Sequence, residues 1–109
     1  MTSTPEVITR YLTAADAQDA EAMAACFTED GSVVDEGETY KGHDEIVGWR
    51  AATAAKWTYT STVTGTEPVT EGEHRVFVHI EGNFPGGAAD LTYRFVLDGD
   101  RIAGLTIAG

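Results

Sequence analysis

The stretch FTEDGSVVDEGETYKGHDEIVGW, residues 27–49, decides the fold of this chain. Its glycines and acidic residues predict a series of short elements. These are a turn at residues 29–31, a strand over 32–35, a second turn at 36–38, a strand over 39–41 and a helix from His43 or Asp44. Asp35 directly follows the apolar pair Val33-Val34. We therefore expect its carboxylate at the edge of the region that this strand buries.

The segments before and after this stretch differ in the spacing of their apolar residues. Before it, Tyr11 belongs to a stripe with three- and four-residue steps, which predicts a helix capped by Thr4, and Asp19 is expected to cap a second helix. After it, the spacing changes to two, which is typical of strands. Four strands are expected, over residues 57–69, 75–84, 89–97 and 101–107.

Alternation along these strands predicts which side chains share a face. One face is apolar and is expected to form the core side. It carries Leu91, Tyr93, Phe95, Leu97, Val76, Val78, Ile80, Ala103, Leu105 and Ile107. Ile102 is expected on the opposite face. The other face carries Phe77, His79 and Arg94 and is not fully polar. An incompletely polar outer face indicates a homodimer packed through it.

Three helices followed by a run of strands predict one α+β domain over residues 1–109. The helices are expected to pack on the concave face of a curved, mainly antiparallel sheet. Such a cone is hard to fill with its own side chains. A pocket is therefore expected inside it.

Composition excludes several classes of partner. Eighteen acidic residues against seven basic ones give a net charge of −11, and the basic residues are scattered, so binding to nucleic acid or anionic lipid is not expected. No apolar run approaches the roughly 20 residues of a membrane span, and the first residues lack a signal pattern, which favours a cytoplasmic protein. The histidines His43, His74 and His79 have no ligand spacing, so no metal is expected.

Several segments together resemble the NTF2-like superfamily, and more narrowly its SnoaL-like and ketosteroid-isomerase-like members. The segments are Arg10-Tyr11-Leu12, residues 27–35, Gly42 with Ile46 and Trp49, Tyr93-Arg94-Phe95 and residues 98–102. The resemblance covers essentially the whole chain and implies a cone-shaped α+β fold. It also implies an apolar pocket for a small hydrophobic carbonyl compound and, in the enzymes of the group, proton transfer of isomerase or cyclase type without a cofactor.

The resemblance assigns roles to individual residues. Asp35 matches the general base of ketosteroid isomerase, and Tyr11 matches the tyrosine that hydrogen-bonds the oxygen of its dienolate. The second donor of that enzyme, a protonated aspartate, falls on Leu91, which can donate nothing. Asp90 is one residue early and faces the other side unless a bulge intervenes. A further pocket tyrosine falls on Arg50.

Plainer interpretations stand beside these roles. Asp35 can be a carboxylate that only flanks a turn, and Tyr11 a core tyrosine. Arg50 can pair with Asp35 or bind an anionic ligand. The residues expected to contact a ligand are Trp49, Arg50, Trp57, Val78, Leu91, Tyr93 and Leu105. The alternative to an enzyme is a binding or accessory domain that holds a hydrophobic molecule without transforming it.

Overall fold

The computed structural model describes residues 4–108, in which three helices and six strands form an α+β domain. Residues 1–3 and 109 of the expected domain lie outside the described residues. The elements are α1 (Glu6–Asp16), α2 (Ala20–Ala25), β1 (Phe27–Asp35), β2 (Glu38–Lys41), α3 (His43–Lys56), β3 (Tyr59–Thr70), β4 (Glu73–Gly82), β5 (Ala88–Asp98) and β6 (Arg101–Ala108). The predicted order of helices and strands is therefore confirmed.

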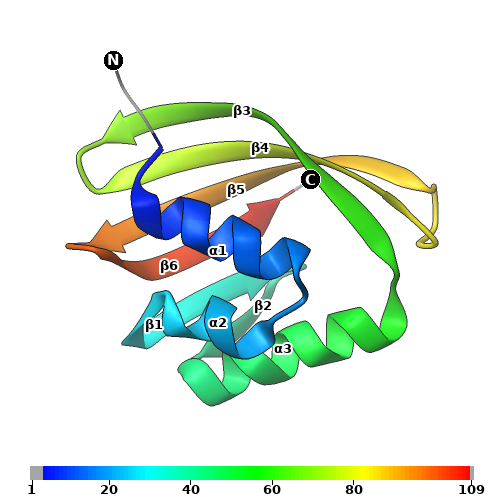
Figure 1. Ribbon diagram of the computed structural model, residues 1–109, viewed down its shortest axis with the longest axis horizontal. Helices are drawn as coiled ribbons and strands as arrows, with labels where there is room; N and C mark the ends of the chain where they lie inside the picture. Colours follow the sequence, from blue (N-terminus) through cyan, green and yellow to red (C-terminus); the bar gives the residue numbers. More distant parts are fainter. Residues whose placement is uncertain (1–3, 109) are drawn as a thin grey trace.

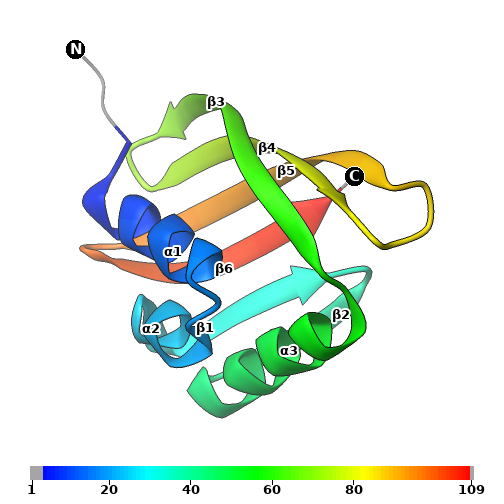
Figure 2. The same cartoon turned by 45° about the vertical axis from the view of Figure 1, so that its right-hand side comes forward.

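The six strands form one sheet in the order β2-β1-β6-β5-β4-β3. All neighbouring strands are antiparallel except β1 and β6, which are parallel. Figure 1 shows the three helices on one side of the sheet, and Figure 2 shows the sheet curving around them. The expected cone, with its helices on the concave face, is confirmed.

The concave face and the helices enclose the hydrophobic core. Tyr11 of α1 lies at its centre, where its ring makes edge contacts with Phe27 and Phe95 at centroid distances of 5.8 and 5.6 Å. Phe95 of β5 and Leu105 of β6 form a register pair, and both are at most 1% exposed. The expected assignment of Leu91, Tyr93, Phe95 and Leu97 to the core side agrees with this packing.

One face assignment was wrong. Ile102 was expected opposite Leu105, but it is 0% exposed and belongs to the same core. The cause is a register shift, in which Val96 pairs with Gly104 whereas Leu97 pairs with Ile102. One residue of β6 is left over, and a bulge of this kind turns the preceding side chain to the other face.

Two local expectations near the helices also differ from the structure. Pro5, with no side-chain cap, precedes α1 in place of the expected Thr4 cap. The expected turn at residues 29–31 is an irregular part of β1, because the pairing with β6 moves from Phe27–Ile102 to Ser32–Gly104. Asp19 caps α2 as expected, since its side chain accepts a hydrogen bond from the amide of Ala22 at 3.1 Å.

Candidate functional site

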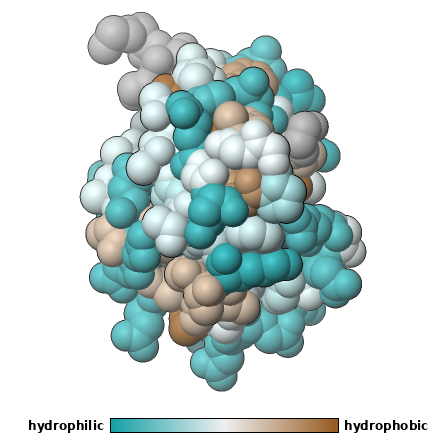
Figure 3. Space-filling view, turned by 90° about the vertical axis from the view of Figure 1, so that its right-hand side faces the viewer, coloured by the Kyte–Doolittle hydropathy of each residue, from teal (hydrophilic) through white to brown (hydrophobic). Residues whose placement is uncertain are grey.

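A cavity of about 750 Å³ lies between α3 and the concave face of the sheet. Exposed residues of its lining, which mark its mouth, include Glu36 in the β1–β2 turn, Lys56 at the end of α3 and Pro85 in the β4–β5 loop. These segments lie on the right of Figure 1, and that side faces the viewer in Figure 3. It is mainly hydrophilic, with small separate hydrophobic areas.

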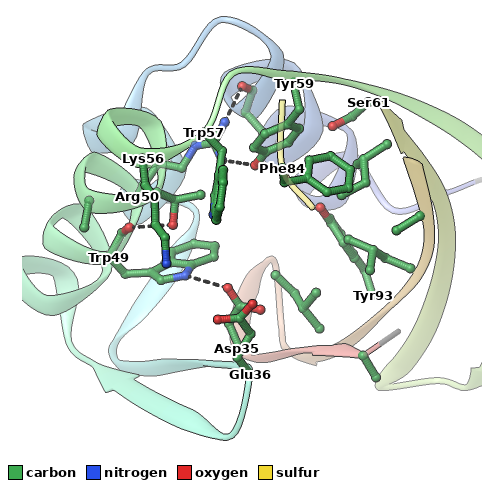
Figure 4. A pocket seen from close by; sticks show the side chains of 18 of the residues that line it. Asp35, Glu36, Trp49, Arg50, Lys56, Trp57, Tyr59, Ser61, Phe84 and Tyr93 are labelled. Atoms are coloured by element: carbon green, nitrogen blue, oxygen red, sulfur yellow. Dashed lines mark hydrogen bonds between the residues drawn. The ribbon is translucent and has the colours of Figure 1, made fainter. Parts of the chain in front are cut away.

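Asp35 lies at the end of β1, and its side chain lines this cavity. Register places it beside Ile107 of β6, which in turn pairs with Tyr93 of β5, so that the three side chains share the concave face. The indole Nε1–H of Trp49 donates a hydrogen bond to Oδ2 of Asp35 at 3.0 Å. This bond, drawn in Figure 4, holds the carboxylate at the cavity wall.

Tyr11 and Tyr93 also line the cavity. The two residues are 1% and 9% exposed, and burial is the main cause that raises the pKa of both phenols above 10. Among the described residues, neither hydroxyl has a hydrogen-bond partner. Both phenols therefore stay protonated at neutral pH and are free to donate to a ligand.

Arg50 does not pair with Asp35, so the structure does not support the first of the two roles considered for it. Its Nη1 donates to the hydroxyl of Tyr59, and its Nη2 donates to the carbonyl oxygen of Ala15 at 3.3 Å. The reason is geometric. Successive residues of a helix point about 100° apart, so Trp49 reaches Asp35 whereas Arg50 reaches β3 and α1.

The cavity brings most of the expected ligand-contacting residues together. Trp49, Arg50, Trp57, Leu91 and Tyr93 all line it. Val78 and Leu105 do not. They are 2% and 1% exposed, because neighbouring core side chains cover them.

Asp90 does not reach the cavity. It pairs with His79 in a regular stretch of β4 and β5, without a bulge, and its carboxylate lies 2.8 Å from Nδ1 of His79 on the outer face. The predicted outer position of His79 is confirmed.

Sequence reasoning missed several residues of the lining, above all Tyr59 and Phe84. The sequence could have predicted Tyr59, because it is two residues beyond Trp57, and alternate residues of a strand share a face. Phe84 lies within the glycine-rich β4–β5 loop, where no periodic pattern exists. Its position depends on the path of that loop.

No group of three or more histidine, cysteine or acidic side chains within residues 4–108 is arranged to hold a metal ion. No helix in that part of the chain is long and apolar enough to cross a membrane.

This geometry is a curved sheet and three helices around a cavity lined by aliphatic and aromatic side chains, two carboxylates and several phenols. It defines an NTF2-like domain. The model of the SnoaL-like domain family matches residues 8–104. The chain belongs to this family. No curated protein matches it.

Solved structures agree with this membership. A protein from Sinorhizobium meliloti, provisionally named a polyketide cyclase, is 30% identical with a TM-score of 0.90, over 96% of this chain and 95% of its own. A protein of ketosteroid-isomerase-like fold from Catenulispora acidiphila, solved with trimethylamine, is 24% identical with a TM-score of 0.88, over 98% and 87%.

A third structure is more distant. The Δ5-3-ketosteroid isomerase of a Mycobacterium species is 15% identical with a TM-score of 0.77, over 95% of this chain and 90% of its own. At this identity, the likeness to the isomerase shows a shared fold alone.

Proposed function

We propose that the cavity binds a small hydrophobic carbonyl compound and that the protein moves a proton at the carbon beside the carbonyl, as cofactor-independent isomerases and cyclases do. One observation carries the proposal. A carboxylate held by an indole, Asp35, lines the same cavity as the two protonated phenols of Tyr11 and Tyr93.

The proposed reaction begins at Asp35. Its carboxylate takes the proton from the carbon next to the carbonyl, and the electrons of the broken C–H bond pass to the carbonyl oxygen, which gives an enolate and a neutral Asp35. The hydroxyl of Tyr11 donates a hydrogen bond to the enolate oxygen. If the enolate is conjugated with a C=C bond, return of the proton from Asp35 to the far carbon of that bond gives an isomer. If the enolate carbon instead attacks a second carbonyl, a ring closes, and the proton of Asp35 passes to the alkoxide that forms.

Tyr93 supplies the second hydrogen bond in this proposal. Leu91, at the position of the isomerase's second donor, cannot donate, but Tyr93 is two residues further along β5 and lines the same cavity. Each oxyanion donor is typically worth about 10²–10³ in rate. A pair of phenols therefore suits an enolate better than Tyr11 alone.

The test is proton exchange in D₂O, followed by NMR, on a panel of cyclic enones and β-keto esters. Wild type is expected to accelerate exchange, and Asp35→Asn to lose most of that acceleration, because an amide cannot accept the proton. Glu36→Gln is the matched control, since Glu36 is an exposed carboxylate at the same mouth. Equal loss in both variants would contradict a specific base at position 35.

A binding or accessory role is the second candidate, and the observation that favours it is the apolar Leu91 in the cavity wall. Trp49 and Trp57 line the cavity, so their fluorescence reports occupancy. Fluorescence changes without exchange by any compound of the panel would favour binding alone.

We also propose a homodimer through the outer face of the sheet. This face carries Val96, which is 41% exposed, and the half-buried Phe77. Light scattering after size exclusion is expected to give twice the mass of the chain, and Phe77→Glu is expected to give a folded monomer. A wild-type monomer at every concentration would exclude this assembly.

A further inference from the structure

Arg50 is a buried cation in the wall of the candidate site. It is 8% exposed, although arginine is almost never fully buried without a charged partner. A guanidinium has five N–H donors. Among residues 4–108 only two hydrogen bonds use them, to the hydroxyl of Tyr59 and the carbonyl oxygen of Ala15, and Nε has no partner there.

Neither of these acceptors carries a negative charge. Within residues 4–108 no carboxylate lies within 4.0 Å of Arg50, whereas Arg75 and Arg94 on the surface pair with Glu67 and Glu73. Arginine cannot lose its proton to escape burial. The ring of Tyr59, with its centroid 5.4 Å from Cζ, compensates the charge only in part. Arg50 is therefore a buried charge without a carboxylate partner among the described side chains.

Asp35 lines the same cavity but is directed elsewhere. Its carboxylate accepts the hydrogen bond from Trp49, the neighbour of Arg50 on α3. Figure 4 shows this separation, with Asp35 below Trp49, and with Arg50 and Tyr59 on the other side of the indole. The cavity thus has a basic end near β3 and a carboxylate end at β1.

We propose that Arg50 binds a carboxylate of the ligand, so that the natural ligand is a hydrophobic oxo acid rather than a neutral ketone. A monoanion fits best. Lys56 is the only other cation in the described lining, and it is exposed at the mouth above the ring of Trp57. The hydroxyl of Tyr59, which accepts from Arg50, keeps its own O–H to donate to the same carboxylate.

This inference deepens the proposed function and relies on it for the carbonyl part of the ligand. With the carboxylate at Arg50, the rest of the molecule extends past Trp49 and Tyr93 towards Asp35. The bound anion is kept at the end of the cavity away from Asp35, which limits the repulsion between the two carboxylates.

The experiment compares acids with their uncharged amides. Benzoate, 2-naphthoate and anthracene-2-carboxylate are each titrated beside the corresponding carboxamide, at low chloride, by calorimetry and tryptophan fluorescence. At least one acid is expected to bind roughly tenfold or more tightly than its amide, because charge-assisted hydrogen bonds exceed neutral ones by about that much.

Variants assign the preference to Arg50. Arg50→Met is expected to bind the acid and the amide within roughly threefold of each other, whereas Lys56→Met, which removes a cation from the same helix, keeps the full preference. Arg50→Lys keeps the charge and is expected to keep part of the preference, so it replaces Arg50→Met if circular dichroism shows the latter unfolded.

Three results would overturn the proposal: amides that bind wild type as tightly as the acids, a preference that survives in Arg50→Met, or no binding of any acid at millimolar concentration. The probes have no hydrogen on the carbon beside the carboxyl group, so they measure binding without turnover. A failure of proton exchange therefore leaves this result intact, and a failure here leaves the exchange result intact.

Discussion

The variant Tyr11→Phe, which lacks only the hydroxyl, distinguishes a structural role of Tyr11 from a chemical one, because the two roles predict opposite results. The ring packs against Phe27 and Phe95, and phenylalanine keeps both contacts. Among the described residues the hydroxyl has no hydrogen-bond partner. Its removal therefore breaks no bond within the protein.

The magnitudes follow from this geometry. Since no hydrogen bond is lost, the free energy of unfolding is expected to change by less than about 1 kcal/mol. The rate of proton exchange is expected to fall by about 10²–10³, which is the usual effect of removing one oxyanion donor. Burial raises the pKa of Tyr11, so the hydroxyl is a donor across the accessible pH range and the ratio of the two rates should not change between pH 6 and about 9.

The assay combines urea unfolding with exchange in D₂O on the best compound of the panel. Tyr93→Phe serves as the comparison, because Tyr93 is also buried and lines the same cavity, and its hydroxyl has no hydrogen-bond partner within residues 4–108. A loss of more than about 2 kcal/mol in Tyr11→Phe, with exchange unchanged, would refute the reasoning and make Tyr11 a core residue only.

Three further predictions concern packing, orientation and pH. Gly82→Ala is expected to lower the free energy of unfolding by about 1–3 kcal/mol, the usual cost of overpacking, because a Cβ there would lie 2.3 Å from the carbonyl oxygen of Thr58. A Cβ at Gly48 in α3 meets nothing within 4 Å, so Gly48→Ala should raise the free energy of unfolding by about 0.5–1 kcal/mol. Urea unfolding checks both, and equal effects would contradict the close approach. Trp49→Phe is expected to slow exchange about tenfold with the affinity for neutral ligands nearly unchanged, since Asp35 loses the donor that orients it; an unchanged kcat would refute this positioning role. Burial lowers the pKa of His74 below 6.5, so the unfolded state binds a proton more readily than the folded state. The free energy of unfolding should therefore fall as the pH drops below about 6.5. A His74→Gln variant with the same pH dependence would exclude His74 as the cause.

Much of the fold could be predicted because its signals are local. The change of apolar spacing from about 3.6 to 2 near Trp57 separated helix α3 from the strands, and alternation along β5 assigned Tyr93 to the core side. Local patterns fail where a residue is inserted. The bulge in β6 turns Ile102 inward, and the alternation of the neighbouring residues does not predict the extra residue.

The candidate site was predictable only in part. The place of Asp35 after Val33-Val34, together with the family resemblance, indicated a cavity-lining carboxylate, and Trp49 and Arg50 were expected to contact a ligand. Sequence reasoning offered Arg50 as a partner for Asp35, but the structure gives Asp35 the indole of Trp49 instead. The two candidates are adjacent in sequence, and no spacing rule distinguishes them.

By itself, the sequence determined the order of the helices and strands, the core faces of β4 and β5, and the acidic surface, because these depend on neighbouring residues and on composition. Tertiary structure alone decided which polar groups meet. Trp49 reaches Asp35 across 14 residues, and Arg50 reaches Ala15 across 35. Such contacts depend on the rotation of α3 about its axis against β1 and β3, which the packing of the whole core sets and no local pattern encodes.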